Sequence, residues 1–479
     1  MDVKFELMVP GAKAAGEHRV TSPWDLSEIG VVPTIDSNGA QMALATAHAV
    51  FRDRSRWLTP QQRIEVLEKT AAIMSERFEQ LALEAASEGG KPLLDSRVEV
   101  ARAIDGVRNS IECLRSESGR EIPMNLNAAS ANRLAFSRKE PIGVVMSVSA
   151  FNHPLNLIVH QVAPAIATGC PVIVKPAEDT PLSCFRFVQI LREAGLPESH
   201  CQAVMTSDLQ VASQLVTDPR VAFFSFIGSA KVGWMLRSQL AAGTRCALEH
   251  GGAAPVIIAQ DADLDDTLPL IAKGGFYHAG QVCVSVQRVF AHSSIAREVA
   301  DRLSEMAAKM SIGDPTLESS EIGPLIRPRE VERVHGWVQE AISEGAQCLV
   351  GGDRNSATSY QSTVLYAPAQ SSKVSQLEIF GPVICVYPFD DIDEAIERAN
   401  SLDVAFQASV LTRNIDTAMH CYSKLDASAV MVNDHTAYRV DWMPFAGLRQ
   451  SGLGIGGIPY TIEDMQIEKM MVLRSNELL

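Results

Sequence analysis

Short apolar runs alternate with longer amphipathic segments along most of this chain. From residue 144 onward, the runs are rich in Val, Ile and Phe and fall at 144–148, 172–174, 203–205 and 221–226. The segments between them have helical length and fall at 155–168, 183–194, 209–217 and 231–242. Continuous apolar runs separated by helices are typical of parallel strands that are buried on both faces. The pattern therefore predicts a doubly wound α/β sheet.

The alternation resumes after the pair Gly251-Gly252, with strands expected at 255–258, 286–291, 383–387 and 429–432 and helices at 295–310 and 392–400. Two interruptions stand apart: a polar, Asn- and Ala-rich stretch at 122–136 and a strand-like run at 465–473. We therefore expect two doubly wound α/β domains plus a small β element. The expected bounds are 1–119 with 142–251 for the first domain, 252–450 for the second, and 120–141 with 460–479 for the β element. A site is expected in the cleft between the domains.

Composition and charge exclude several classes of protein. The 479 residues exceed what one hydrophobic core usually supports, and the formal net charge of -15 argues against a general nucleic-acid surface. The most apolar helical stretch, 155–169, contains polar residues, and the first residues lack the apolar core of a secretory signal. We expect a soluble, cytoplasmic protein that binds neither nucleic acid nor membrane.

Nine Cys are scattered along the chain without a C-x-x-C pair, so neither a disulfide framework nor a metal site is expected. Cys283 differs in context because it follows Gly280 in a glycine-containing segment, where the backbone can approach a ligand closely. A single Cys is more often a buried, inert side chain. As a thiol with an ordinary pKa of about 8.5, a nucleophilic Cys needs a base or a favourable field.

Polar residues follow several of the expected strands, and the carboxyl ends of parallel strands face the binding crevice. Glu249 ends the run 245–249 and could act as a base, or it could be a solvated loop residue. Asn152 follows the strand at 144–148 and could donate to an oxyanion, or it could cap the next helix. Lys175 and Glu178 follow the next strand and could hold ribose hydroxyls, or they could form an ordinary charged turn.

In their order and spacing, these segments resemble the NAD(P)-dependent aldehyde dehydrogenase superfamily over roughly residues 20–475. The most specific motifs are Lys175-Pro176-Ala177-Glu178, Phe226 to Gly233, Leu248-Glu249-His250-Gly251-Gly252, Gly280-Gln281-Val282-Cys283, Glu378-Ile379-Phe380-Gly381-Pro382, and Pro444-Phe445-Ala446-Gly447 with Ser451-Gly452. The resemblance implies that the first domain binds NAD, that the second is catalytic, and that the β element joins subunits into a homodimer or homotetramer.

The resemblance also implies a mechanism for the aldehyde. Cys283 is expected to attack its carbonyl carbon, while the Asn152 amide and the Cys283 backbone N–H hold the alkoxide. Hydride then passes to nicotinamide, and the resulting thioester is hydrolysed by water that Glu249 activates. Relatives that transfer the acyl group to coenzyme A commonly lack this base, so hydrolysis is the preferred reading. A coenzyme A-acylating enzyme and a catalytically silent relative are the alternatives.

The cofactor residues implied by the resemblance are Ser149, Phe151, Lys175, Glu178, Gly228, Ser229, Val232, Glu378 and Phe380. A carboxylate at position 178 would repel a 2′-phosphate, so NAD is expected in preference to NADP. The sequence departs from the common pattern at Phe151, Ile227, His250 and Ala446, where many members have Trp, Thr, Leu and Gly. These changes affect the fit of the cofactor and the shape of the pocket more than the reaction class.

Four basic residues are candidates for substrate binding: Arg102, His153, Arg288 and Arg439. Cations around one pocket mouth would suit an aldehyde that also carries a carboxylate, phosphonate, sulfonate or phosphate. Each Arg could instead serve in a surface or intersubunit salt bridge. The residues around Asn152 and Cys283 look similar to the branch of phosphonoacetaldehyde and lactaldehyde dehydrogenases, which favours a small anionic aldehyde.

Overall fold

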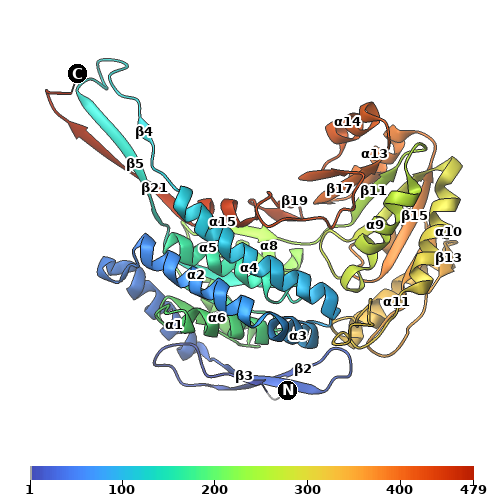
Figure 1. Ribbon diagram of the computed structural model, residues 1–479, viewed down its shortest axis with the longest axis horizontal. Coiled ribbons are helices and arrows are strands. Elements are labelled where there is room, and N and C mark those ends of the chain that lie inside the picture. Colours follow the sequence, from blue (N-terminus) through green and yellow to red (C-terminus); the bar gives the residue numbers. More distant parts are fainter. Residues whose placement is uncertain (1–2, 479) are drawn as a thin grey trace.

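Residues 3–478 are described by a computed structural model, in which two α/β lobes lie side by side (Figure 1). The first lobe contains a six-stranded sheet in the order β20-β10-β9-β6-β7-β8, parallel except for β20. Its elements are β6 (Val144–Val148), α5 (Asn156–Thr168), β7 (Val172–Lys175), α6 (Leu182–Glu193), β8 (Cys201–Ala203), α7 (Leu209–Thr217), β9 (Val221–Ile227), α8 (Ala230–Arg237), β10 (Arg245–Glu249) and β20 (Gly452–Leu453).

The second lobe contains a seven-stranded sheet in the order β13-β14-β15-β12-β11-β17-β18, in which only the edge strand β13 is antiparallel to its neighbour. Its elements are β11 (Ala254–Ile258), α9 (Leu264–Phe276), η2 (Tyr277–Gly280), β12 (Val286–His292), α10 (Ser293–Lys309), α11 (Pro328–Ser343), β13 (Gln347–Val350), β14 (Thr363–Tyr366), α12 (Lys373–Gln376), β15 (Val383–Phe389), α13 (Ile392–Asn400), β17 (Gln407–Leu411), α14 (Ile415–Lys424) and β18 (Ala429–Val432). A two-stranded pair, β16 (Val404–Ala405) and β19 (Leu448–Arg449), lies apart from this sheet.

The chain changes sheets between β10 and β11, at residues 250–253. The boundary expected between residues 251 and 252 falls in this stretch, and the domain bounds stay a prediction. After β19 the chain returns to the first lobe, where α15 (Ile458–Asp464) packs against α4 (Leu93–Ser116) and α5. The predicted class, two doubly wound α/β units with a small β element, is confirmed.

The first lobe also carries a layer of structure that the strand–helix alternation did not predict. A three-stranded sheet in the order β1-β3-β2 precedes four long helices, of which α4 packs along α2, α3 and α5. These elements are β1 (Val3–Lys4), β2 (Gly16–Thr21), β3 (Glu28–Thr34), α1 (Ser37–Arg52), η1 (Arg54–Arg56), α2 (Pro60–Glu76), α3 (Phe78–Gly89) and α4 (Leu93–Ser116).

A separate β arm projects from the body beside the end of α4 (Figure 1). It consists of β4 (Glu121–Ile122), β5 (Arg133–Pro141) and β21 (Gln466–Arg474), in the antiparallel order β21-β5-β4. The strand expected at 465–473 is therefore present, whereas residues 460–464 of the expected β element belong to helix α15. Several apolar side chains of β21, including Met470 and Val472, are exposed on this arm.

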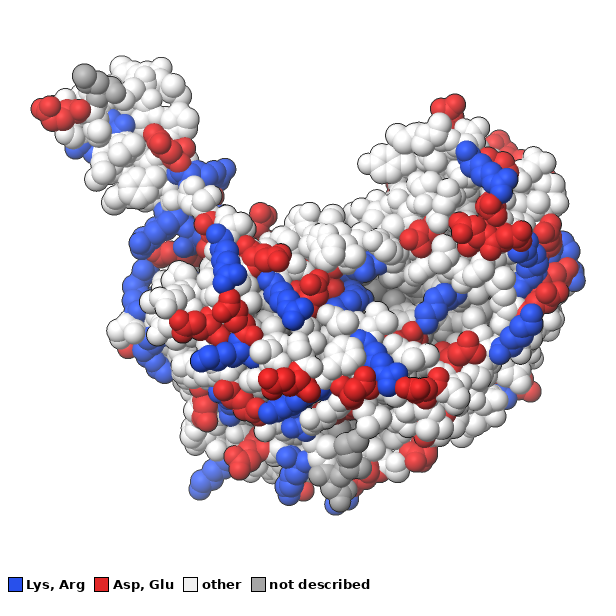
Figure 2. Space-filling view, viewed as in Figure 1, with Lys and Arg blue, Asp and Glu red and all other residues white. Residues whose placement is uncertain are grey.

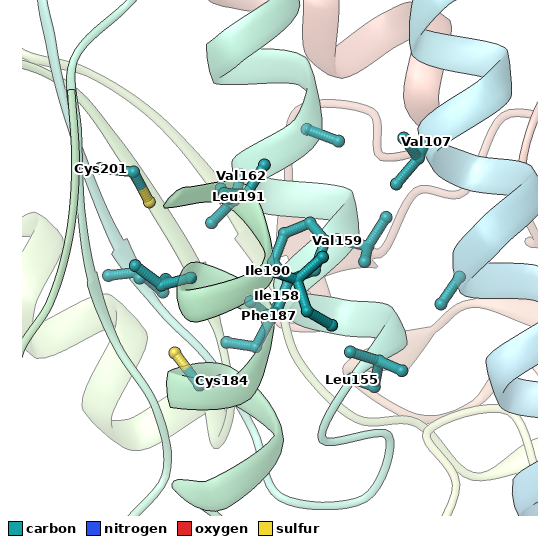
Figure 3. Close-up of a cluster of buried hydrophobic side chains, with 14 of the residues drawn as sticks. Val107, Leu155, Ile158, Val159, Val162, Cys184, Phe187, Ile190, Leu191 and Cys201 are labelled. Atoms are coloured by element: carbon teal, nitrogen blue, oxygen red, sulfur yellow. The ribbon is translucent and has the colours of Figure 1, made fainter. Parts of the chain in front are cut away.

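Part of a large hydrophobic core cluster of the first lobe lies between α5 and α6 (Figure 3). Every residue of α5 is buried, and Ile158, Phe187 and Leu191 are among the side chains that fill the space between the two helices. Cys184 and Cys201 belong to the same cluster, and burial raises the pKa of the Cys201 thiol to about 12. These two Cys therefore have the inert, structural setting that is usual for the residue.

Charges of both signs are interspersed over the face of the molecule shown in Figure 2. No helix within residues 3–478 has the length and hydropathy needed to cross a membrane. Over the same residues, no group of three or more His, Cys, Asp or Glu side chains is arranged to hold a metal ion. All nine Cys are free thiols.

Truncation of a core side chain between α5 and α6 should destabilise the first lobe. Leu191 is fully buried, so Leu191→Ala should lower the free energy of unfolding by about 2–5 kcal/mol through lost burial and a residual cavity. Leu317→Ala is the matched control: the side chain is 53% exposed, and we expect a change within about 0.5 kcal/mol. Chemical denaturation measures both, and equal effects of the two substitutions would contradict this packing.

Candidate active site

A cavity of about 770 Å³ opens where the two lobes meet. Its walls come from residues at or just after the ends of β6, β7, β9 and β10 in the first lobe, and from four segments of the second lobe, around residues 277–284, 327–329, 378–380 and 437–445. The carboxyl ends of parallel strands gather at one edge of a sheet, which explains why loops distant in sequence meet here. The volume is typical of a site for a small molecule with its cofactor.

The structure brings together all but one of the site residues expected from the sequence. The cavity is lined by Cys283, Glu249 and Asn152, by the cofactor candidates Ser149, Phe151, Lys175, Glu178, Gly228, Ser229, Val232, Glu378 and Phe380, and by the substrate candidates Arg102, His153 and Arg439. The exception is Arg288.

Arg288 does not reach this cavity, so its expected role in binding substrate is corrected. Its guanidinium donates to the backbone oxygens of Ala253, Arg398 and Ala399 at 2.9, 3.2 and 2.9 Å. Two of these oxygens belong to the last turn of α13, where a cation stabilises the helix end. Sequence proximity to Cys283 was misleading because β12 begins at Val286 and directs the residue at 288 toward α13.

The loop that presents Cys283 adopts an unusual backbone conformation. His278, Ala279 and Gly280 have φ values of 49°, 53° and 70°, all in the left-handed region. A Cβ at Gly280 would lie 2.0 Å from the Gly381 carbonyl oxygen, so only glycine allows the two backbones to approach this closely. The glycine before Cys283 thus fixes the course of the loop.

Asn152 joins this loop to the first lobe. Its Nδ2 donates to the Gln281 carbonyl oxygen at 2.9 Å, and the side chain is buried. The alternative role as a helix cap does not apply, because the N-cap position of α5 is Leu155. The amide has two N–H donors, so one of them is left for a bound ligand.

A carboxylate from another helix supplies the missing cap of α5. Glu99 on α4 accepts hydrogen bonds from the backbone N–H groups of Leu155 and Asn156 at 2.9 and 3.0 Å. It also pairs with Lys91 at 2.5 Å, and both side chains are fully buried. This pair holds the segment that carries Asn152. Neither residue could be recognised from the sequence, because charged residues are normally solvent-exposed.

Burial, together with the neighbouring charges of Glu378 and Glu249, raises the pKa of the Cys283 thiol to about 12, while Arg439 opposes this shift. Burial also raises the pKa of Glu249, again opposed by Arg439. The pKa of Glu378 rises to about 8 for the same reason, although the Gly252 N–H donates to its carboxylate at 3.1 Å. Three acidic groups and one cation therefore share the centre of the cavity.

The far end of the cavity fits a dinucleotide. Gly228 and Ser229 precede α8, and no side chain within residues 3–478 caps the first N–H groups of that helix, which leaves them available for a phosphate. Lys175 and Glu178 line the wall beyond, and burial lowers the pKa of Lys175 against the effect of Glu178. A Cβ at Gly251 would lie 2.0 Å from the Glu378 carboxylate, so glycine there admits this side chain to the site.

The basic candidates differ in how far their charges are neutralised. Arg102 forms two hydrogen bonds with Asp441, at 3.1 and 2.7 Å. The Asp441 carboxylate also lies 2.7 Å from Nε2 of His160. Burial acts to raise the pKa of Asp441, but His160 and Arg102 hold that pKa well below its ordinary value. Burial and the charges of nearby cations lower the pKa of His153, which keeps the imidazole neutral.

Arg439 is the cation with unused donors. Its Nε and one terminal nitrogen are buried without a hydrogen-bond partner in the described chain, and its guanidinium lies 3.6 Å from the centre of the Phe445 ring. A buried guanidinium normally satisfies its N–H groups, so this arrangement leaves room for an anion.

Three comparisons relate this chain to known proteins. The model of the aldehyde dehydrogenase family matches residues 11–471. The 3-sulfolactaldehyde dehydrogenase of Priestia aryabhattai is 38% identical over 448 residues, 93% of this chain and 92% of that protein. The lactaldehyde dehydrogenase of Methanocaldococcus jannaschii is 32% identical over 458 residues, covering 95% and 96% of the two chains.

A solved structure extends the likeness to the fold. Glyceraldehyde-3-phosphate dehydrogenase GapN from Methanocaldococcus jannaschii, complexed with NADP, superimposes with a TM-score of 0.90 at 32% identity over 96% of this chain and 99% of that one. The family match and the identity over nearly the full length agree with the cavity and its residues. The chain belongs to the aldehyde dehydrogenase family and is an NAD(P)-dependent oxidoreductase that converts aldehydes to acids.

Proposed function

We propose that the protein oxidises a small anionic aldehyde to its carboxylate with NAD, through a thioester on Cys283. The observation that carries this proposal is the meeting of four groups in one cavity: the Cys283 thiol, the Glu249 carboxylate, the Asn152 amide and the partner-free donors of Arg439. Each supplies a function that the reaction needs: nucleophile, base, oxyanion donor and anion anchor.

In this reaction the Cys283 thiol loses its proton to solvent through water in the cavity, and the sulfur attacks the aldehyde carbon. The second N–H of the Asn152 amide and the Cys283 backbone N–H donate to the oxygen as it becomes an anion. NAD(P), when bound, supplies the hydride acceptor. The residues that would hold it are Lys175, Glu178, Ser229 and Glu378, with Phe151 and Phe380 packed edge to face at 5.8 Å between ring centres.

The need for a base follows from the electrostatics of the cavity. With a pKa raised to about 12, the Cys283 thiol is almost entirely protonated at neutral pH. Glu378 has a pKa of about 8 and is mostly neutral there, so its charge adds little repulsion at that pH. A proton acceptor is therefore needed before the sulfur attacks; water in the cavity takes the thiol proton to solvent, and Glu249 acts in the later hydrolytic step.

Hydrolysis is favoured over transfer to coenzyme A because Glu249 is available to act on water. Burial and the charge of Arg439 are the influences on the pKa of its carboxylate within residues 3–478, with no hydrogen bond among them, so the carboxylate is available to accept a proton from water. A catalytically silent relative would not need to retain the nucleophile, the base and the amide in one cavity.

Arg439 supports an anionic substrate better than the other basic candidates do. Arg102 is already paired with Asp441, and His153 is neutral. Two of the relatives described above are named for anionic aldehydes, 3-sulfolactaldehyde and glyceraldehyde-3-phosphate. Lactaldehyde, which is neutral, is the second candidate because it names another relative.

Three further expectations belong to this proposal. NAD should be preferred because the Glu178 carboxylate would repel the 2′-phosphate of NADP, although one relative binds NADP. The exposed apolar side chains of the β arm should join subunits into a homodimer or homotetramer. The free state of all nine Cys agrees with a reducing, cytoplasmic location.

An aldehyde panel tests the proposed reaction. We expect 3-sulfolactaldehyde and phosphonoacetaldehyde to be oxidised with NAD, with a lower kcat/KM when NADP replaces it, and with no dependence on coenzyme A. NADH absorbance follows the reaction, and chromatography identifies the acid. A requirement for coenzyme A would favour the acylating alternative, and absence of NADH with every aldehyde would favour the silent one.

Loss of the Arg439 charge should change the choice of substrate. Lactaldehyde and 3-sulfolactaldehyde form a matched pair that differs by a sulfonate, so the ratio of their kcat/KM values isolates the anion contact. We expect Arg439→Leu to lower the preference for the sulfonate roughly 10- to 100-fold, the value of a charged hydrogen bond. Arg439→Lys should retain part of it. An unchanged ratio in Arg439→Leu would place the anion site elsewhere.

The charge of Glu378 should control the titration of Cys283. Above pH ~8 Glu378 is ionised and raises the pKa of the thiol. Glu378→Gln should therefore lower the pKa of Cys283 by about 1 unit, so that iodoacetamide alkylates it faster in alkaline buffer. The control is Glu178→Gln, because Glu178 also lines the cavity but is not among the groups that shift the pKa of Cys283. An alkylation profile that is the same in both variants, or shifted upward in Glu378→Gln, would contradict this electrostatic assignment.

A further inference from the structure

The carboxylate of Glu249 lies directly against the bare Cα of Gly456. A Cβ built at Gly456 would lie 2.0 Å from Oε1 of Glu249 and 3.0 Å from its carboxyl carbon. Carbon and oxygen atoms that are not bonded do not approach to 2.0 Å, so even a methyl group at 456 would have to displace this carboxylate. The space that the carboxylate occupies therefore exists because residue 456 is glycine.

The backbone at Gly456 is not free to withdraw from this contact. Its N–H donates to the Phe445 oxygen at 2.6 Å, and the Phe445 N–H donates back to the Gly456 oxygen at 3.0 Å. Phe445 is itself buried and packs on Phe406 with 4.4 Å between ring centres. The same Cβ would also lie 3.0 Å from the Phe445 oxygen, so both sides of the position are closed.

The backbone of Glu249 is fixed as well. It lies at the end of β10, in register with Ile227 of β9 on one side and Gly452 of β20 on the other. Its carbonyl oxygen also accepts a hydrogen bond from the Gly228 N–H at 3.0 Å. A clash at 456 can therefore be relieved only by rotation of the Glu249 side chain, which moves the carboxylate.

We propose that Gly456 is a positioning residue for the general base: its missing side chain sets where the Glu249 carboxylate stands when the thioester is hydrolysed. This inference rests on the proposed function, in which Glu249 activates the attacking water. Gly456 lies in the segment between β20 and α15, which contributes no reactive group but in this proposal fixes the position of the base.

The step that depends on this position is hydrolysis of the thioester, the second half of the cycle. The water oxygen forms a bond to the acyl carbon while one water proton passes to Glu249, and the C–S bond then breaks with its electron pair returning to Cys283 as thiolate. The proton on Glu249 then passes to this thiolate, which leaves the carboxylic acid as product and restores the free enzyme. A carboxylate displaced by about 1 Å loses contact with this water, and misplacements of that size can cost roughly 100-fold in rate.

The test compares Gly456→Ala with the unaltered enzyme in rapid-mixing experiments with NAD and the best aldehyde of the panel. We expect steady-state kcat to fall roughly 10- to 100-fold while a burst of NADH equal to the active sites remains. Hydroxylamine attacks a thioester without a protein base, so it should restore turnover in Gly456→Ala. Gly336→Ala is the matched control, because a Cβ at Gly336 meets no atom within 4 Å, and its kinetics should be unchanged.

A second comparison separates positioning from a general defect in folding. Gly456→Ala should lower the Tm when Glu249 is present and should lower it much less in the Glu249→Ala background, where the clashing side chain is absent. NAD binding, followed by fluorescence quenching, should be retained in each folded variant.

The inference is overturned by a normal steady-state rate in Gly456→Ala, by loss of the burst together with turnover, by failure of hydroxylamine to restore turnover, or by equal destabilisation in both backgrounds. These results leave the proposed function standing as long as the unaltered enzyme shows its burst and forms acid. The proposed function itself fails if the unaltered enzyme shows neither.

Discussion

The hydrogen bond from the Asn152 amide to the Gln281 carbonyl is the contact on which the site depends, because it joins the loops of two separate lobes. Asn152 follows β6 of the first lobe, and Gln281 stands two residues before Cys283 in the second. Behind Asn152, the buried pair of Lys91 and Glu99 holds the start of α5. Loss of one partner in such a pair typically costs about 3–5 kcal/mol, so this anchor is rigid.

The electrostatics of the cavity follow from the same geometry. Where the lobes meet, the Cys283 thiol is buried beside two carboxyl groups, and this disfavours the ionised forms of the thiol and of the carboxyl groups. The Arg439 cation offsets this effect only in part. The consequence is a nucleophile that stays protonated until a base takes its proton. A buried cation with unused donors also gives an anionic substrate a place in a cavity that otherwise repels anions.

Much of the fold could be predicted from the sequence, and the successes and failures have physical causes. The strands β6 and β18 and the helices α7 and α13 have the bounds that apolar periodicity predicted, because each is flanked by clear breaks in the pattern. The helices α1 to α3 were missed, because strand–helix alternation was the guide and these helices follow one another without intervening strands. Helix α8 ends at Arg237, earlier than predicted.

The candidate site was predictable where chemistry follows a strand end, as at Asn152 and Glu249. It was not predictable where a residue's role depends on the direction of its side chain or on a packing contact with a distant segment. Arg288 was misassigned because its side chain points to the end of α13, and the distance in sequence from Cys283 does not reveal this. Gly456 carried no signal, because its importance lies in an atom it lacks and in a neighbour that is distant in sequence.

The most direct test of the thioester on Cys283 is mass spectrometry of the Glu249→Gln variant after mixing with NAD and an accepted aldehyde. Without its base the acyl group should accumulate, and peptide mapping should place a mass increase equal to the acyl group on the peptide that contains Cys283 and on no other. An acyl group on another residue, or NADH formation with no acylated enzyme at any time, would contradict the account.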